Sequence, residues 1–302
     1  MRGEMESGMK TAFLFSGQGA QYPGMGKDLY ENYDSAKAVF DSIATDFDVK
    51  TLCFEGSKEQ LDDTQYTQVA IFAHAMAAAA VLQENGIHAD VTAGLSLGEY
   101  SALCYADCFS VQAGAEILRE RGKLMANALP SGTSAMAAVL MLDKEAILNA
   151  CEAVQDIGVC EIANYNCPGQ LVISGSVPGI DAACEKMLAA GAKRALKLKV
   201  GGAFHSPLME PARAELAAAI EATPIHKPSC PVYQNVSTKG ETCPETIKTN
   251  LIAQLTAPVR WTQSVQNMIA DGADHFIELG PGAVLQGLVK KINKEVTTEG
   301  MQ

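Results

Sequence analysis

"HADVTAGLSLGEYSALCYAD", residues 88–107, joins a short apolar strand to a helical segment through a serine flanked by glycines. Ser96 lies between Gly94 and Gly98 in the pattern G-x-S-x-G. In α/β folds this pattern forms a sharp turn from strand to helix, which exposes the serine hydroxyl at the edge of the sheet. The stretch therefore predicts an α/β fold with Ser96 as a nucleophile. The alternative is a turn with a structural role only.

Strand-like and helical segments alternate along most of the chain, which predicts a mainly parallel sheet. Residues 10–16 resemble a strand that ends in a glycine-rich turn, and residues 231–237 and 275–280 resemble later strands. A buried, alanine-rich helix is expected over residues 67–86. Its apolar stretch, residues 69–82, is too short and too interrupted to predict a membrane span.

The middle of the chain has a different order of elements. Strand, helix, strand, strand, helix and strand are expected in turn over residues 135–142, 143–154, 159–166, 169–175, 177–191 and 193–200. This βαββαβ order is that of a ferredoxin-like unit. We therefore expect a small ferredoxin-like subdomain at residues 130–199, inserted into a large α/β subdomain of residues 9–129 and 200–302. A cleft between two such subdomains is a usual place for a ligand.

The composition is that of a globular protein, with 302 residues, 48% of them hydrophobic, and a formal net charge of −12. The negative charge argues against nucleic acid as the main partner. Nine cysteines without a CxxC pair favour a reducing compartment and offer no zinc site. The charged N-terminus does not resemble a signal peptide, and residues before about Met9 are expected to form a disordered extension. We expect a cytoplasmic protein without a metal ion.

A serine hydroxyl needs a base to become a good nucleophile. His205, in "GGAFHSPLM", is the best candidate among the five histidines, because Ser206 and Pro207 resemble the start of a helix that would fix its position. An ordinary loop histidine is the alternative. The other four are expected in a helix, in a surface loop and at the starts of two strands: His74, His226, His88 and His275. No acidic residue stands out as a third member.

The loop "FSGQGAQ", residues 15–21, follows the first expected strand. It lacks the third glycine of a dinucleotide-binding loop and the GK[ST] of a P-loop, so the sequence does not favour nucleotide binding. A loop in this place is well suited to stabilise an oxyanion. We expect the backbone N–H of Gln18 to be the donor.

Together these features resemble the malonyl-CoA:acyl carrier protein transacylases of type II fatty acid synthesis and the acyltransferase domains of polyketide synthases. Seven stretches carry the resemblance, in the family's order: "FSGQGAQYPGMG", "GLSLGEYSAL", "RERGKLM", "NYNCPGQLVISG", "GAFHSPLM", "QLTAPVRW" and "ELGPGAVLQGL". They run from about Phe13 to Ile292. The resemblance implies a hydrolase-like α/β core with a mainly parallel sheet and an inserted ferredoxin-like subdomain.

The resemblance implies that Ser96 accepts the acyl group and that His205 is its base. A backbone carbonyl near Gln254 would orient His205, which would explain the missing acidic residue. Coenzyme A would leave before the phosphopantetheine thiol of the carrier protein takes the malonyl group, in a ping-pong reaction without a cofactor.

The resemblance also implies the groups that hold the substrate. The N–H groups of Gln18 and Leu97 would form the oxyanion hole, and Asn166 would line the pocket. Arg121 would bind the free malonyl carboxylate, which favours malonyl over acetyl and transfer over hydrolysis. Taken alone, "RERGK" is more typical of a solvated helix face.

Three positions next to these motifs refine the comparison. Ser16 replaces a proline that the family often has, and Leu95 replaces a histidine before the serine; neither removes a chemical group from the mechanism. Phe204, before His205, resembles malonyl-selective members.

The expected partners are malonyl-CoA and an acidic acyl carrier protein, with the chain as a monomer away from membranes. The dense basic runs predict that four residues steer the carrier protein: Lys193, Arg194, Lys290 and Lys291. Solvated faces are the alternative. Two other functions stay open, a serine esterase or thioesterase on a similar core, and a binding module without catalysis.

Overall fold

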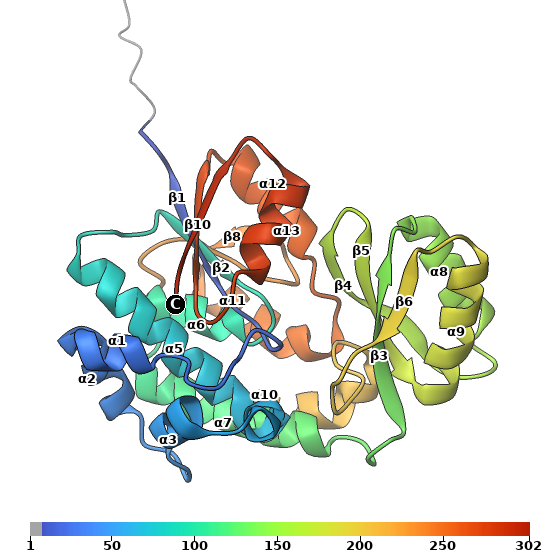
Figure 1. Ribbon diagram of the computed structural model, residues 1–302, viewed down its shortest axis with the longest axis horizontal. Coiled ribbons are helices and arrows are strands. Elements are labelled where there is room, and N and C mark those ends of the chain that lie inside the picture. Colours follow the sequence, from blue (N-terminus) through green and yellow to red (C-terminus); the bar gives the residue numbers. More distant parts are fainter. Residues whose placement is uncertain (1–7) are drawn as a thin grey trace, which may run out of the picture.

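The computed structural model describes residues 8–302 and contains two separate sheets (Figure 1). The large sheet has the strand order β10-β9-β1-β2-β7-β8, and only the β7–β8 pair is antiparallel. Its strands are β1 (Thr11–Phe15), β2 (Val91–Gly94), β7 (Val232–Tyr233), β8 (Gly240–Glu241), β9 (His275–Leu279) and β10 (Thr297–Met301). The disordered extension expected before Met9 concerns residues 1–7, which lie outside the described residues.

Strands β1, β2 and β9 are buried along their whole length. Continuous apolar runs form such strands because helices cover both faces of a parallel sheet. Apolar side chains form one buried cluster on each face, around Phe13 and Phe15 on one side and around Leu14 and Trp261 on the other. The carboxyl ends of β1 and β2 therefore lie side by side, and the glycine-rich loop and Ser96 follow them directly.

Helices surround the large sheet. They are α1 (Lys27–Asn32), α2 (Asp34–Ser42), α3 (Val49–Glu55), α4 (Lys58–Asp62), α5 (Thr64–Glu84), α6 (Gly98–Tyr105), α7 (Val111–Asn127), α10 (Glu210–Glu221), α11 (Pro244–Ala253), α12 (Trp261–Ala270) and α13 (Val284–Ile292). There are also two 3-10 turns at the site described below. The turn η1 (Pro207–Met209) precedes α10, and the turn η2 (Gln254–Thr256) follows α11.

Helix α5 is the longest element, with 21 residues, and is buried almost all round. Contrary to the expectation from its apolar stretch, it is long and apolar enough to cross a membrane by length and composition. However, 83% of its most apolar window is buried inside the protein. Its many alanines allow close packing with α7, which makes it a core helix of this fold.

The small sheet has the order β4-β5-β3-β6 and is antiparallel throughout. Its elements follow as β3 (Ser134–Leu140), α8 (Lys144–Ala153), β4 (Cys160–Cys167), β5 (Gln170–Ser176), α9 (Val177–Ala189) and β6 (Arg194–Lys197). This is the expected βαββαβ order, and α8 and α9 pack on the sheet with a core of their own. The predicted α/β fold with a mainly parallel sheet and a small antiparallel one is confirmed; the limits at residues 130 and 199 stay a prediction.

Strand β4 joins the small sheet to the rest of the chain. The N–H of Val259 donates to the carbonyl of Ala163 at 2.7 Å, and the N–H of Tyr165 donates to the carbonyl of Val259 at 2.9 Å. This bridge fixes β4 beside the segment that follows η2. Strand β4 of the small sheet is thereby tied to the segment that follows Gln254.

Candidate active site

The turn between β2 and α6 is tight and strained. Ser96 has a φ of 55°, in the left-handed region that side chains other than glycine rarely adopt. A Cβ atom on Gly98 would lie 2.3 Å from the carbonyl oxygen of Phe15, and one on Gly94 would lie 1.8 Å from the carbonyl oxygen of Gly98. Both glycines are therefore required for the backbone to pass, and the turn presents the Ser96 hydroxyl beyond the strand ends.

Ser96 and His205 are in hydrogen-bond contact, although 109 positions separate them in the chain. Oγ of Ser96 lies 2.8 Å from Nε2 of His205, and Nδ1 of His205 lies 2.9 Å from the backbone carbonyl oxygen of Gln254. A carbonyl oxygen can only accept, so Nδ1 carries the proton and Nε2 offers its lone pair to the serine hydroxyl. Ser206 caps the turn η1 that follows, which helps to hold His205 in place.

The imidazole of His205 is neutral at physiological pH. Burial lowers its pKa to about 4, and the positive charge of Arg121 adds to the effect. A neutral imidazole with a free lone pair on Nε2 is the form that can accept a proton from a hydroxyl.

Arg121 is almost fully buried, with 1% of its surface exposed, which does not fit a solvated helix face. Its Nη1 donates to Oε1 of Gln68 at 2.8 Å, and its Nη2 donates to Oγ of Ser96 and to Oε1 of Gln254, both at 3.1 Å. The guanidinium also lies over the ring of Tyr100, 5.3 Å from its centre. Nε of Arg121 has no hydrogen-bond partner among the described residues. A buried cation with a free donor beside a nucleophile is suited to an anionic substrate.

Two backbone N–H groups near Ser96 remain free. The N–H groups of Gln18 and Leu97 take part in none of the hydrogen bonds found among residues 8–302. A Cβ atom on Gly17 would lie 2.7 Å from the carbonyl oxygen of Leu95, so the loop with Gln18 lies against the serine turn. The N–H of Leu97 lies at the start of α6, where the helix favours negative charge.

A comparison with protein families shows to which family the chain belongs. The sequence model of the family described as "Acyl transferase domain" matches residues 12–301. The chain belongs to the acyl transferase domain family.

The sequences of individual acyl transferases are similar to this one over nearly its whole length. The malonyl CoA-acyl carrier protein transacylase of Bacillus subtilis is 45% identical over 292 residues, 96% of this chain and 92% of that protein. The same enzyme of Staphylococcus aureus is 44% identical over 296 residues, 97% of this chain and 96% of that protein. The resemblance inferred from the seven stretches is confirmed.

Solved acyl transferase structures also match closely. An acyl-carrier-protein-S-malonyltransferase from Bartonella henselae has a TM-score of 0.95 at 39% identity, covering 97% of this chain and 95% of that one. A malonyl-transacylase solved in complex with a type II polyketide synthase acyl-carrier protein has a TM-score of 0.93 at 38% identity, covering 97% and 96%.

Three other positions noted in the sequence have the following surroundings. Asn166 is buried on β4, and its Oδ1 has no partner among the described residues, but no hydrogen bond joins it to Ser96 or His205. The hydroxyl of Ser16 donates to the carbonyl oxygens of Leu279 and Pro281 at 3.2 Å, so it has partners of its own where a proline would have none. Leu95 is half-buried against the cluster around Trp261.

The four basic residues expected at a docking surface come from two parts of the molecule. Lys193 and Arg194 are exposed at the start of β6, an edge strand of the small sheet, whereas Lys290 and Lys291 are exposed at the end of α13 (Figure 1). Nζ of Lys290 donates to the carbonyl oxygen of Val296, so its charge is partly tied to its own loop.

Three buried polar residues of the site escaped the sequence prediction. Glu99 is fully buried in α6, Gln68 is fully buried in α5, and Asn235 follows β7. Burial raises the pKa of Glu99 to about 7. For Glu99 and Gln68, the signal available in the sequence was a polar side chain inside an otherwise apolar helix, since such a group needs a buried partner.

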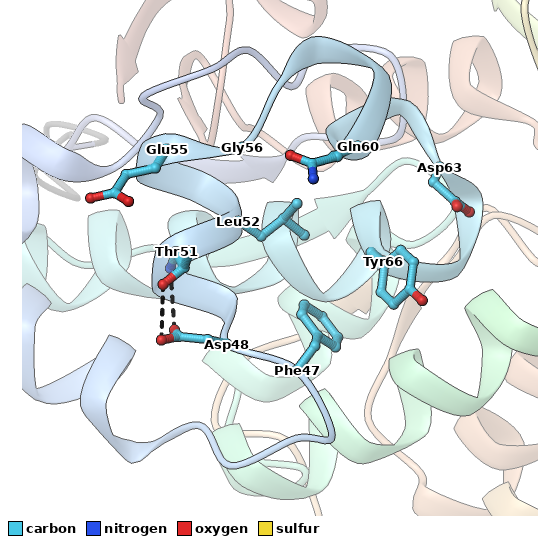
Figure 2. A pocket seen from close by; sticks show the side chains of 9 residues that line it. All are labelled: Phe47, Asp48, Thr51, Leu52, Glu55, Gly56, Gln60, Asp63 and Tyr66. Carbon is cyan, nitrogen blue, oxygen red and sulfur yellow. Dashed lines mark hydrogen bonds between the residues drawn. The ribbon is translucent and has the colours of Figure 1, made fainter.

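One cavity lies away from this centre. It has a volume of about 530 Å³ and lies between α3, α4 and the start of α5 (Figure 2). Its carboxylates Asp48 and Asp63 already cap the helices α3 and α5. A second cavity of about 280 Å³ lies between Tyr165 and Arg260. Neither cavity is lined by Ser96 or His205. Among residues 8–302 no group of three or more potential ligands could hold a metal ion.

Proposed function

We propose that this chain transfers the malonyl group from malonyl-CoA to the phosphopantetheine thiol of an acyl carrier protein through a malonyl-Ser96 intermediate. The observation that carries the proposal is the buried guanidinium of Arg121, 3.1 Å from the Ser96 hydroxyl. An esterase for neutral acyl groups has no use for this cation. The names of the relatives, malonyl CoA-acyl carrier protein transacylases, support the same substrate and acceptor.

In the first half-reaction Nε2 of His205 takes the proton of Ser96 as Oγ attacks the thioester carbonyl carbon. The carbonyl oxygen becomes negative and is held by the free N–H groups of Gln18 and Leu97. The intermediate collapses, the carbon–sulfur bond breaks, and His205 gives its proton to the coenzyme A sulfur. Ser96 then carries the malonyl group as an ester.

The second half-reaction repeats these steps in reverse. His205 takes the proton of the phosphopantetheine thiol, and the sulfur attacks the ester carbonyl carbon. The bond to Oγ breaks, and the proton returns to Ser96. The carbonyl of Gln254 holds Nδ1 of His205 throughout, so the positive imidazolium is stabilised without a carboxylate.

Arg121 determines which acyl group is held. Its charge-assisted hydrogen bonds to the distal carboxylate contribute about 1.5–3 kcal/mol, or roughly 10- to 150-fold over acetyl. The bond from Nη2 to Oγ weakens once Ser96 is an ester, which frees a second donor for the carboxylate. A fixed acyl group also leaves little room for water. Asn166 lines the pocket, and Phe204 favours malonyl over branched analogues.

The proposal includes the setting of the reaction. The chain acts as a cytoplasmic monomer of fatty acid synthesis, without a cofactor. The acidic carrier protein docks on a surface that includes Lys193, Arg194, Lys290 and Lys291. The small subdomain, residues 130–199, forms one wall of the cleft in which the thioester binds.

A partition experiment tests the proposal. The malonyl-protein is isolated after reaction with labelled malonyl-CoA and then mixed with phosphopantetheinylated carrier protein or with buffer. We expect the label on the carrier protein in the first case and a persistent malonyl-protein in the second. Rapid release of free malonate in both would identify a hydrolase. Unchanged turnover of the Ser96→Ala variant would identify a different nucleophile, and no turnover in either protein would identify a binding module.

A further inference from the structure

Ser96 is fixed by two side-chain amides that come from a different part of the chain. The N–H of Ser96 donates to Oδ1 of Asn235 at 2.9 Å, and Nε2 of Gln254 donates to the carbonyl oxygen of Ser96 at 2.8 Å. The two amides also bond to each other, from Nε2 of Gln254 to Oδ1 of Asn235 at 3.1 Å. Both backbone groups of the strained residue thus have a partner outside their own turn, in addition to the bond from the N–H of Glu99 to the carbonyl of Ser96.

Asn235 also binds the other side of the turn. Its Nδ2 donates to the carbonyl oxygen of Gly94 at 2.7 Å, two residues before Ser96. One amide therefore bridges the end of β2 and the nucleophile. A residue with φ near 55° persists only when its surroundings fix it, and these contacts supply that constraint.

The backbone of Asn235 is itself anchored. Its N–H donates to Oε1 of Glu99 at 2.6 Å, and its carbonyl oxygen accepts from the N–H of Arg260 at 3.1 Å. Asn235 and Glu99 are both fully buried. Because Glu99 belongs to the first turn of α6, the helix that Ser96 precedes, the anchor lies three residues from the nucleophile.

The orientation of the oxyanion hole follows from the same contacts. The carbonyl of Ser96 and the N–H of Leu97 belong to one planar peptide group and point in opposite directions. The carbonyl of Ser96 accepts from Gln254 and also from the N–H of Glu99 at 3.1 Å, and these two contacts hold the N–H of Leu97 as well. Asn235 holds the amide of Gln254 in turn, and so acts on nucleophile and oxyanion donor together.

We infer that Asn235 is a positioning residue that sets the geometry of Ser96 and Leu97 for acyl transfer. It contacts neither the acyl group nor His205, and it acts through the backbone. The inference rests on the proposed function for its substrate, but the arrangement it describes applies to any attack by Ser96. A displacement of about 1 Å at a reacting centre can cost roughly 100-fold in rate.

The test compares Asn235→Ala with Asn235→Asp and with Asn250→Ala. The aspartate keeps the oxygen that accepts from Ser96 and replaces the amide donor to Gly94 with an oxygen, which donates to that carbonyl only while the buried carboxyl is protonated. Asn250→Ala is the matched control, because Asn250 donates to Oε1 of Gln234 at 2.9 Å and has no hydrogen bond to the serine turn among the described residues. The thermal midpoint of each variant reports whether it is folded.

Two rates are measured for each variant, single-turnover acylation by malonyl-CoA and labelling of Ser96 by a small fluorophosphonate. We expect Asn235→Ala to slow both by about 10- to 100-fold, Asn235→Asp to recover at least part of the loss, and Asn250→Ala to stay near the wild type. In a Ser96→Ala background, Asn235→Ala should leave the Kd of malonyl-CoA nearly unchanged.

Near-normal rates in Asn235→Ala would overturn the inference. So would a rise in the Kd of malonyl-CoA that equals the loss in rate, because the residue would then act in binding. If the wild type reacts with the fluorophosphonate but not with malonyl-CoA, the proposed function fails, while the effect of Asn235→Ala on labelling still decides the positioning role.

Discussion

Nη2 of Arg121 lies 3.1 Å from Oγ of Ser96, so a buried cation and the candidate nucleophile share a hydrogen bond. The same guanidinium lowers the pKa of His205. One residue of α7 therefore contacts the candidate nucleophile and adds to the effect of burial on the pKa of the candidate base, and in the proposed reaction it also binds the substrate. This coupling makes the account testable with substitutions at a few positions.

The first prediction concerns acyl selectivity. Arg121→Ala removes the charge that binds the distal carboxylate, so the ratio of kcat/KM for malonyl-CoA to that for acetyl-CoA should fall by about 10- to 150-fold. Arg119→Ala is the matched control, because Arg119 lies on the same helix but bonds to Asp46 at the surface. An equal loss on both substrates would remove the carboxylate contact from the account.

The second prediction concerns the pH dependence of acylation. His205 acts as a base only when neutral, and its pKa is lowered to about 4, so the acylation rate should rise with pH near 4 and be flat above about 6. Arg121→Ala should move this rise to higher pH, since one cause of the low pKa is gone. The acylation rates of the wild type and of Arg121→Ala are compared with acetyl-CoA as the substrate, because acetyl has no carboxylate for Arg121 to bind. Each rate is measured shortly after the enzyme is moved to the test pH. A rise centred near 6.5 in the wild type would contradict the buried, neutral imidazole.

The third prediction concerns stability in acid. His74 is fully buried, neither ring nitrogen has a hydrogen-bond partner among the described residues, and burial lowers its pKa to about 4. Between pH 6.5 and 4 the unfolded chain binds a proton there that the folded chain does not, so the folded state loses stability as the pH falls.

We expect His74→Leu to abolish this contribution. Its free energy of unfolding relative to the wild type should rise by up to about 3 kcal/mol between pH 6.5 and 4, measured by urea titration. A constant difference between His74→Leu and the wild type would show that His74 is protonated in the folded protein.

The fourth prediction separates the two half-reactions. Reversing the charges of Lys193 and Arg194 should slow transfer to the carrier protein and leave acylation by malonyl-CoA unchanged. Lys291→Glu should act more strongly than Lys290→Glu, because the ammonium of Lys290 already bonds to its own loop. The effect should shrink at high salt. Equal losses in both half-reactions would exclude a docking role.

The sequence predicted those parts of the site that depend on local pattern. Ser96 was predicted from its flanking glycines, and His205 from the helix start that follows it. Arg121 and Gln254 entered only through the resemblance, because nothing in their own neighbourhoods shows that they are buried. Burial depends on the packing of α5, α7 and η2, which no single stretch specifies.

Two predicted strands are longer than the strands in the structure. Residues 231–237 were predicted as a strand, but β7 contains only Val232 and Tyr233. The chain leaves the sheet because the N–H of Asn235 donates to Glu99 and not to a neighbouring strand. The strand expected over residues 193–200 likewise shortens to Arg194–Lys197. Contacts between distant segments decide where these strands end, and they are invisible to local pattern.

The most direct measurement is the location of the malonyl group on the protein after reaction with malonyl-CoA, by tandem mass spectrometry of its peptides. We expect the label on one residue, Ser96. The label should leave Ser96 when phosphopantetheinylated carrier protein is added. The His205→Ala variant should gain the label much more slowly than the wild type. A label on another residue, or none on a protein that still transfers malonyl, would contradict the account.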